Sequence, residues 1–136
     1  MKFDFDDTDF ERGLAAAERA IARGAERGMH DATDDLLRES RDLAPLDKAT
    51  LRRGSWKEIE EADGSVIGDV YYSAVEKDRA GNRFNYALYM HEFGGHMQYA
   101  NPTTPGTQPK YLEQPLKMYS DRYMKMIAEE IRRELT

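Results

Sequence analysis

Three residues near the middle of the chain, His91, Glu92 and His96, are of types that could bind a metal ion. In a zinc peptidase helix, two histidines stand four residues apart, so that both rings leave one helical face beside the catalytic glutamate. Here the histidines are five residues apart, and roughly 500° of helical rotation places their rings about 140° apart around the axis. Gly94 and Gly95 also fall where the helix would have to continue, and glycine costs about 1 kcal/mol there relative to alanine. The spacing therefore predicts no metal site.

Other catalytic chemistry also lacks a sequence signal. No nucleophile, base and orienting group can be assembled from local motifs, and no glycine-rich loop precedes a helix with a lysine in place for phosphate binding. The chain has no cysteine, which excludes disulfides and cysteine nucleophiles. We predict a protein that is not an enzyme and needs no cofactor.

Composition limits the remaining classes. The 136 residues fit one domain. No apolar run reaches the roughly eighteen residues that a membrane span needs, and the first residues lack the basic start and apolar stretch of a secretion signal. We therefore expect synthesis in the cytosol and no membrane partner. The net charge of −6 argues against a general duplex-binding protein, because neutralising phosphates requires a surplus of lysine and arginine.

A long helical pattern runs from Thr8 to Leu43. Thr8 is predicted to be the N-cap, with Glu11 completing a capping box, and Pro45 ends the pattern. The apolar stripe is thin and rich in alanine. It consists of Phe10, Leu14, Ala17, Ile21, Ala25, Ala32, Leu36 and Leu43.

Gly24 and Gly28 leave two structures open for this region. The chain could form a hairpin or kink at the glycines, or a single helix, part of which packs on a neighbouring subunit. We favour a continuous or mildly bent helix, because no proline or turn cluster interrupts the pattern. Two glycines four residues apart on one face would also permit the close approach of a second helix.

A β-hairpin is predicted next. Ser55 to Glu60 alternates in polarity, Ala62-Asp63-Gly64 is a turn signal, and Ser65 to Ser73 is rich in β-forming residues. Trp56 is interpreted as a core or sheet-face anchor, because large aromatic residues dominate core burial. The segment from Glu76 to Arg83 is a charged turn, which fits a solvated loop or a contact arm.

The last third of the chain holds a loop between two helical segments. The apolar segment from Tyr86 to Phe93 stops at the glycine pair, and a proline-punctuated loop follows to Pro109. A closing helix from Leu112 to Leu135 is predicted, with Pro115 in its first turn. Its expected buried stripe is Leu116, Tyr119, Tyr123, Ile127, Ile131 and Leu135, widened by Met118, Met124 and Met126.

These elements predict a single α+β domain over residues 1–136. A small, mainly antiparallel sheet from Ser55 to about Tyr86 is expected to be covered by the long N-terminal helix and the C-terminal helix. Residues 2–6 read Lys-Phe-Asp-Phe-Asp, which is strand periodicity over a short length. Segment 1–7 is therefore either an extended strand that adds to a sheet edge or a disordered terminus.

Two stretches resemble the tail-completion or head–tail joining proteins of long-tailed bacteriophages, which are often labelled minor capsid or neck proteins. One is the Tyr-Ala segment at Tyr86, the Glu-Phe-Gly turn, the proline-rich loop and Tyr-Leu-Glu-Gln-Pro-Leu at Tyr111. The other is Leu43-Ala-Pro-Leu-Asp-Lys-Ala-Thr-Leu-Arg-Arg-Gly-Ser55. The sequence departs from the family pattern at Lys48-Ala49, where a glycine commonly closes the turn, and in its second glycine and His96 after Phe93.

The resemblance covers residues 10 to 135 and implies a structural virion protein of the neck or tail end. It implies a homo-oligomeric ring, six-fold by analogy or twelve-fold, between a head adaptor or stopper and a tail terminator or tube. DNA would pass through the lumen without specific binding. Acids on polar helix faces are the candidates to line this lumen, namely Asp31, Asp34, Asp35, Glu129 and Glu130.

We expect the charged turn and the proline-rich loop to contact neighbouring subunits or rings. The expected interface residues are Lys77, Arg79, Arg83, Tyr99, Asn101, Pro102, Pro105 and Tyr111. Two other functions compete with this one: a metal-dependent hydrolase that uses His91, Glu92 and His96, and a small stand-alone protein-binding module.

Overall fold

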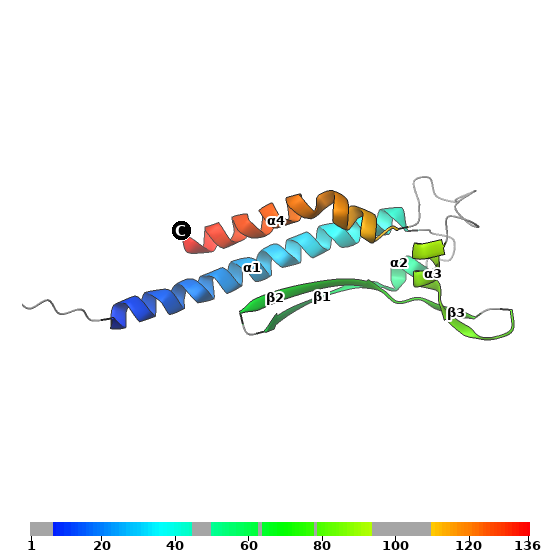
Figure 1. Ribbon diagram of the computed structural model, residues 1–136, viewed down its shortest axis with the longest axis horizontal. Coiled ribbons are helices and arrows are strands. Elements are labelled where there is room, and N and C mark those ends of the chain that lie inside the picture. The colour runs from blue at the N-terminus through cyan, green and yellow to red at the C-terminus, as the bar shows by residue number, and fades with distance from the viewer. Residues whose placement is uncertain (1–6, 45–49, 63, 78, 94–109) are drawn as a thin grey trace, which may run out of the picture.

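The computed structural model describes residues 7–44, 50–62, 64–77, 79–93 and 110–136. Along the chain its elements are α1 (Thr8–Leu43), α2 (Thr50–Arg53), β1 (Ser55–Ala62), β2 (Ser65–Tyr72), β3 (Val75–Lys77), β4 (Arg83–Asn85), α3 (Tyr86–Phe93) and α4 (Glu113–Leu135). The molecule is elongated, with α1 lying between α4 on one side and the β1–β2 hairpin on the other (Figure 1). The predicted α+β class is confirmed.

Helix α1 is one continuous helix of 36 residues, as favoured from the sequence. At 1.5 Å per residue it is about 54 Å long. Its start differs from the prediction, because the N-cap is Asp7 rather than Thr8. The Glu11 N–H donates to the Asp7 carbonyl at 2.8 Å, and the Asp7 side chain makes no capping hydrogen bond. The predicted capping box centred on Thr8 is therefore wrong.

Two glycines of α1 set its distance from α4. A Cβ atom built on Gly24 would lie 2.5 Å from the Cα of Ile131, and one on Gly28 would lie 2.5 Å from the Cα of Ile127. No side chain fits between the two backbones at these positions. The close approach of a second helix, predicted from the spacing of the glycines, is confirmed, and the second helix is α4.

Ion pairs flank the glycine contact toward the end of α4. Arg27 Nη1 lies 2.8 Å from Glu134 Oε1, and Arg23 Nε donates to Glu134 Oε2 at 3.3 Å. Glu130 is buried against α1, with Arg27 at 3.9 Å and Arg133 at 2.7 Å. Glu130 therefore faces the helix contact, and its predicted place on a lumen-lining polar face is wrong.

A second polar cluster joins the helices through Asp35. Its carboxylate accepts hydrogen bonds from the Tyr123 hydroxyl at 2.9 Å, from Arg38 at 2.6 Å, and from Arg122. Burial raises the pKa of Asp35, but the hydrogen bonds from Arg38, Tyr123 and Arg122 outweigh it and leave the pKa below its ordinary value. Burial and the bond to Asp35 raise the pKa of Tyr123. Asp35 thus joins α1 to α4, and its place in a lumen stays a prediction.

The β1–β2 hairpin packs on the opposite side of α1. The strands are antiparallel, in register from Ser55 opposite Tyr72 to Ala62 opposite Ser65. A Cβ atom on Gly68 would lie 2.7 Å from the side chain of Met29, so β2 approaches α1 closely there. Arg41 Nε donates to Ser55 Oγ at 2.6 Å, and the Ser40 and Tyr72 hydroxyls lie 2.7 Å apart.

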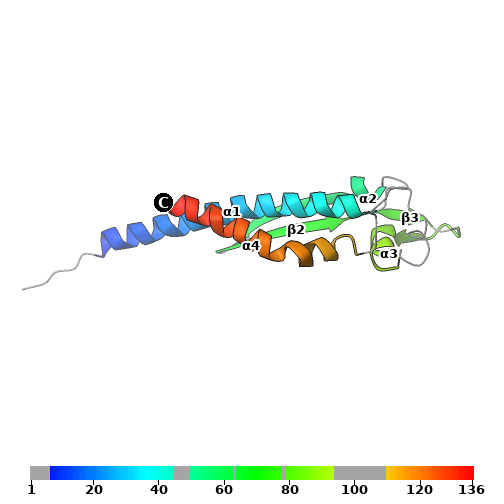
Figure 2. The same cartoon turned by 90° about the horizontal axis from the view of Figure 1, so that it is seen from above.

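The sheet differs from the prediction in two respects. It is divided into two antiparallel pairs, β1–β2 and β3–β4. The main contacts of β1 and β2 with a helix are with α1, whereas α4 packs chiefly on α1 (Figure 2). The expected sheet covered by two helices is therefore not formed. Instead, α1 packs on the β1–β2 hairpin with one face and on α4 with another.

A second core lies where α2, α3 and the start of α4 meet. Its fully buried residues include Leu51, Met90 and Tyr111. The Tyr111 hydroxyl donates to the carbonyl of Ala87 at 2.6 Å, and its ring meets the edge of Tyr72 with centroids 4.9 Å apart. Tyr111 is only 1% exposed. Its predicted role as an interface residue is therefore wrong, because its side chain is part of the core.

The glycine contact yields a stability prediction with an internal control. Gly28→Ala forces the α1 and α4 backbones apart and should lower the free energy of unfolding by roughly 1–3 kcal/mol. Gly13→Ala places the same methyl group in the same helix, where nothing lies within 4 Å, and should raise it by about 0.5–1 kcal/mol. Urea unfolding measures both. Equal effects of the two changes would contradict the contact.

Candidate functional site

His91 is held in place by both of its ring nitrogens. It lies on α3, where Nδ1 donates to Glu92 Oε1 at 2.9 Å, and Nε2 accepts a hydrogen bond from the backbone N–H of Glu113 at 3.3 Å. This pattern selects the tautomer protonated at Nδ1. The imidazole thereby satisfies a free N–H at the start of α4, which is a structural role.

The hydrolase alternative finds no support in this geometry. A metal ion would have to displace one of the two hydrogen bonds of His91, and His96 lies outside the described residues. In the part of the chain that the structure describes, no cluster of three or more histidine, cysteine or acidic side chains could hold a metal ion.

A charged cluster brings together the end of α3 and the start of α4. The backbone N–H of Lys110 donates to the His91 carbonyl at 3.0 Å. The Lys110 ammonium pairs with Glu92 and lies 3.4 Å from Glu113, which also pairs with Lys117 at 2.7 Å. Lys110 has a φ of 57°, in the left-handed region that side chains rarely adopt. We call His91, Glu92, Lys110 and Glu113 the clasp.

The ion pairs of the clasp shift the pKa values of Glu92, Glu113 and Lys110. The hydrogen bond from Lys110, followed by that from His91, lowers the pKa of Glu92. The hydrogen bonds from Lys117 and Lys110 lower the pKa of Glu113. The bond to Glu92 raises the pKa of Lys110. All three groups are therefore held in their charged forms, which suits a salt-bridge cluster and not a general acid or base at neutral pH.

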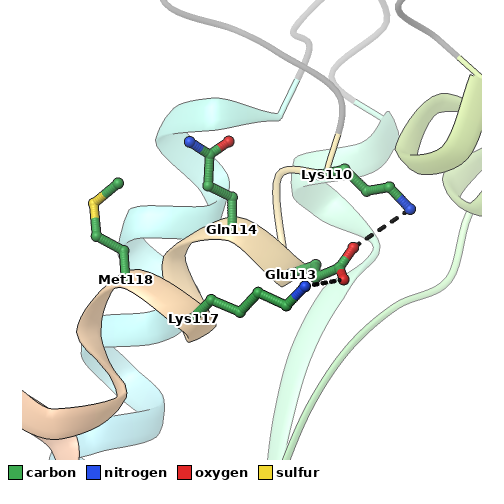
Figure 3. Close-up of a pocket in the computed structure, with 5 residues that line it drawn as sticks. All are labelled: Lys110, Glu113, Gln114, Lys117 and Met118. Carbon is green, nitrogen blue, oxygen red and sulfur yellow. Dashed lines mark ion pairs between the residues drawn. The ribbon is translucent and has the colours of Figure 1, made fainter.

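A pocket of about 660 Å³ lies beside the clasp (Figure 3). The described residues that line it are Lys110, Glu113, Gln114, Lys117 and Met118. Each of its charges has a partner, since both lysines contact Glu113 (Figure 3) and Lys110 also pairs with Glu92 outside the pocket lining. The pocket therefore presents no uncompensated charge that would recognise an ionic substrate.

The expected interface residues fall into two groups. Lys77 on β3, Arg79 in the following turn and Arg83 on β4 are exposed. They lie on the β3–β4 hairpin at the end of the molecule opposite the start of α1 (Figure 1). Their contacts with a neighbour stay a prediction. The other expected residues, Tyr99, Asn101, Pro102 and Pro105, lie outside the described residues.

The outer face of the β1–β2 hairpin carries an apolar patch that the sequence interpretation missed. Alternation along the strands points Trp56, Ile67 and Tyr71 away from α1, and they are 61%, 46% and 38% exposed. Trp56 and Tyr71 are cross-strand partners. Of the two places expected for Trp56, the core is wrong and the sheet face is correct, because Ser55 and its neighbours of the same parity face α1.

The same face is acidic. Glu58, Glu60 and Asp69 share the parity of the apolar residues and are exposed. The Tyr71 hydroxyl donates to Glu58 Oε1 at 3.2 Å. Burial and this hydrogen bond raise the pKa of Tyr71. We call Trp56, Glu58, Glu60, Ile67, Asp69 and Tyr71 the outer sheet face.

Comparison of the chain with protein-family models, curated proteins and solved structures finds no significant match. Among the described residues, no helix is both long enough and apolar enough to cross a membrane. The functional argument therefore depends on the surfaces of this chain and on the resemblance of its motifs.

The clasp predicts how Glu92 titrates. Its carboxyl should have an NMR titration midpoint below the ordinary glutamate value, and Lys110→Met should move the midpoint upward. Because the folded-state pKa is lowered, the pairing stabilises the protein above the unfolded-state pKa and is lost as the pH falls through the folded-state pKa. Lys125→Met, on an exposed turn of α4, is the matched control. An unchanged midpoint in Lys110→Met would contradict the clasp.

Proposed function

We propose that this chain is a structural subunit of a bacteriophage neck, which assembles into a closed ring that joins or completes the tail and lets DNA pass. The observation that carries the proposal is the outer sheet face. Its tryptophan, isoleucine and tyrosine are exposed on a two-stranded sheet whose other face is already covered by α1. Trp56 and Tyr71 form an exposed aromatic pair, and the Glu58–Asp69 pair separates it from Ile67. Exposed aromatic residues beside charges are typical of protein–protein contact sites.

A second apolar surface supports an assembling protein. The first turns of α1 extend beyond the end of α4 and beyond the tip of the β1–β2 hairpin (Figure 1). Phe10 and Leu14 lie on this projecting part and are 63% and 51% exposed. A helix stabilised by tertiary packing normally buries such residues, and a neighbouring subunit would cover them.

The charge of the chain suits a channel for DNA. Acidic residues outnumber basic ones, 26 to 20. A ring of such subunits can therefore have a lumen without rows of lysine and arginine, through which duplex DNA slides without binding. Of the acids expected on polar helix faces, Asp31 and Glu129 are exposed, and Asp34 is exposed while pairing with Lys57. Ring closure requires that each subunit meet the next through two different patches.

Particle assembly tests the proposal. In a phage whose genome encodes this chain, replacing Trp56 by serine should leave separate heads and tails, because the neighbour contact is lost. The variant should keep the wild-type urea midpoint, because most of the indole surface is already in solvent. Leu88→Ser, on α3 and also exposed, is the control and should give joined particles. A virion in which the chain is absent from the neck would refute the proposed function.

A further inference from the structure

The solvent-facing side of α4 differs in charge from the rest of the surface described above. Lys117, Asp121, Lys125 and Arg132 are spaced four, four and seven residues apart, so they share one face of the helix. Met118 and Met124 border this face and are 61% and 66% exposed. We call these six residues the outer α4 face.

The outer α4 face and the outer sheet face are complementary. The first has three cations against one carboxylate, and the second has three carboxylates and no cation. Lys117 already pairs with Glu113, so Lys125 and Arg132 are the cations that the contact uses. The first offers two methionines, and the second offers Trp56 and Tyr71. Methionine sulfur contacts aromatic rings favourably, and its flexible chain adapts to an irregular surface. Complementary charge sets the register of such a contact and disfavours like-with-like pairing.

The two faces also lie on opposite sides of the molecule. Val70 on the inner side of β2 shares a core cluster with Tyr123 of α4, but the sheet face and the α4 face that point away from α1 lie on opposite sides of the molecule (Figure 1). They therefore cannot meet within one chain. Their lengths are similar, since the eight residues of each strand span about 26 Å and the helix from Lys117 to Arg132 spans about 23 Å.

We infer that a second copy of this chain covers the outer sheet face with its outer α4 face. The contact is heterologous, since one patch meets a different patch, so it repeats from copy to copy and closes into a ring when the rotation permits. Each hairpin would then have a helix on both faces: α1 of its own chain and α4 of the next. This inference rests on the proposed function of an assembling subunit and names the two surfaces that meet.

Charge reversal tests the contact through two single-face variants. One carries Lys125→Glu and Arg132→Glu on α4, and the other carries Glu60→Lys and Asp69→Lys on the sheet. Each places like charges against each other and should weaken self-association roughly tenfold or more. An equimolar mixture should assemble again, because each face of one variant then meets the opposite charge on the other. Because the two variants must alternate, closed rings in the mixture are expected to contain an even number of copies.

Native mass spectrometry of the full chain at low ionic strength measures the outcome, because surface charge contacts weaken with salt. Arg53→Glu, at an exposed position of α2, is the control and should assemble as the wild type does. The inference is overturned by a monomeric wild type, by single-face variants that assemble normally, or by a mixture that stays apart. None of these results removes the chain from the phage neck, so the proposed function is judged separately by particle assembly.

Discussion

The contact between the α1 and α4 backbones at Gly24 and Gly28 is the constraint on which the rest of the structure depends. With no Cβ atoms between them, the helices approach until Ile127 and Ile131 rest on the glycine backbone. Arg23, Arg27 and Asp35 then lie within reach of charged or hydroxyl partners on α4. The contact fixes the rotation of α4 about its axis, and this rotation directs its lysines and methionines outward. A bulkier residue at either glycine would change both the packing and the exposed surface.

The sequence predicted the elements and one of their contacts, because these depend on local patterns. Residue types and their spacing were enough to derive the bounds of α1, the β1–β2 hairpin and the place of Pro115 in the first turn of α4. They also predicted that Gly24 and Gly28 admit a second helix. The burial of Tyr111 could not, because its partners Ala87 and Tyr72 come from other elements. Trp56 could have been placed on the solvent side of the sheet, because it alternates in phase with Glu58 and Glu60 and out of phase with Ile59, but the size of an indole left a core position open. The division of the sheet at Ser73 and Ala74 has no distinct local signal.

His91 and Glu92 show how a motif of reactive residue types can serve the fold. One ring nitrogen contacts the neighbouring carboxylate and the other accepts the first free N–H of α4, while Lys110 joins the same cluster. The spacing argued only against a metal site, and the geometry shows His91 and Glu92 joining α3 to the start of α4. The exposed apolar and charged residues that could contact another chain lie elsewhere, on the outer sheet face and on the outer α4 face. The proposed contact between copies therefore uses the outer sheet face and the outer α4 face. Helix α1 holds these two faces on opposite sides of the molecule.

Site-directed cross-linking tests most directly whether the outer α4 face of one copy contacts the outer sheet face of the next. The chain has no cysteine, so Lys125→Cys on α4 and Asp69→Cys on the sheet would supply the only thiols. With a short bismaleimide, the variant carrying both cysteines should give a ladder of covalent oligomers on a denaturing gel that stops at the copy number of the ring. Each variant with one cysteine should remain monomeric. A double variant that stays monomeric, or single variants that form dimers, would contradict a head-to-tail contact between these faces.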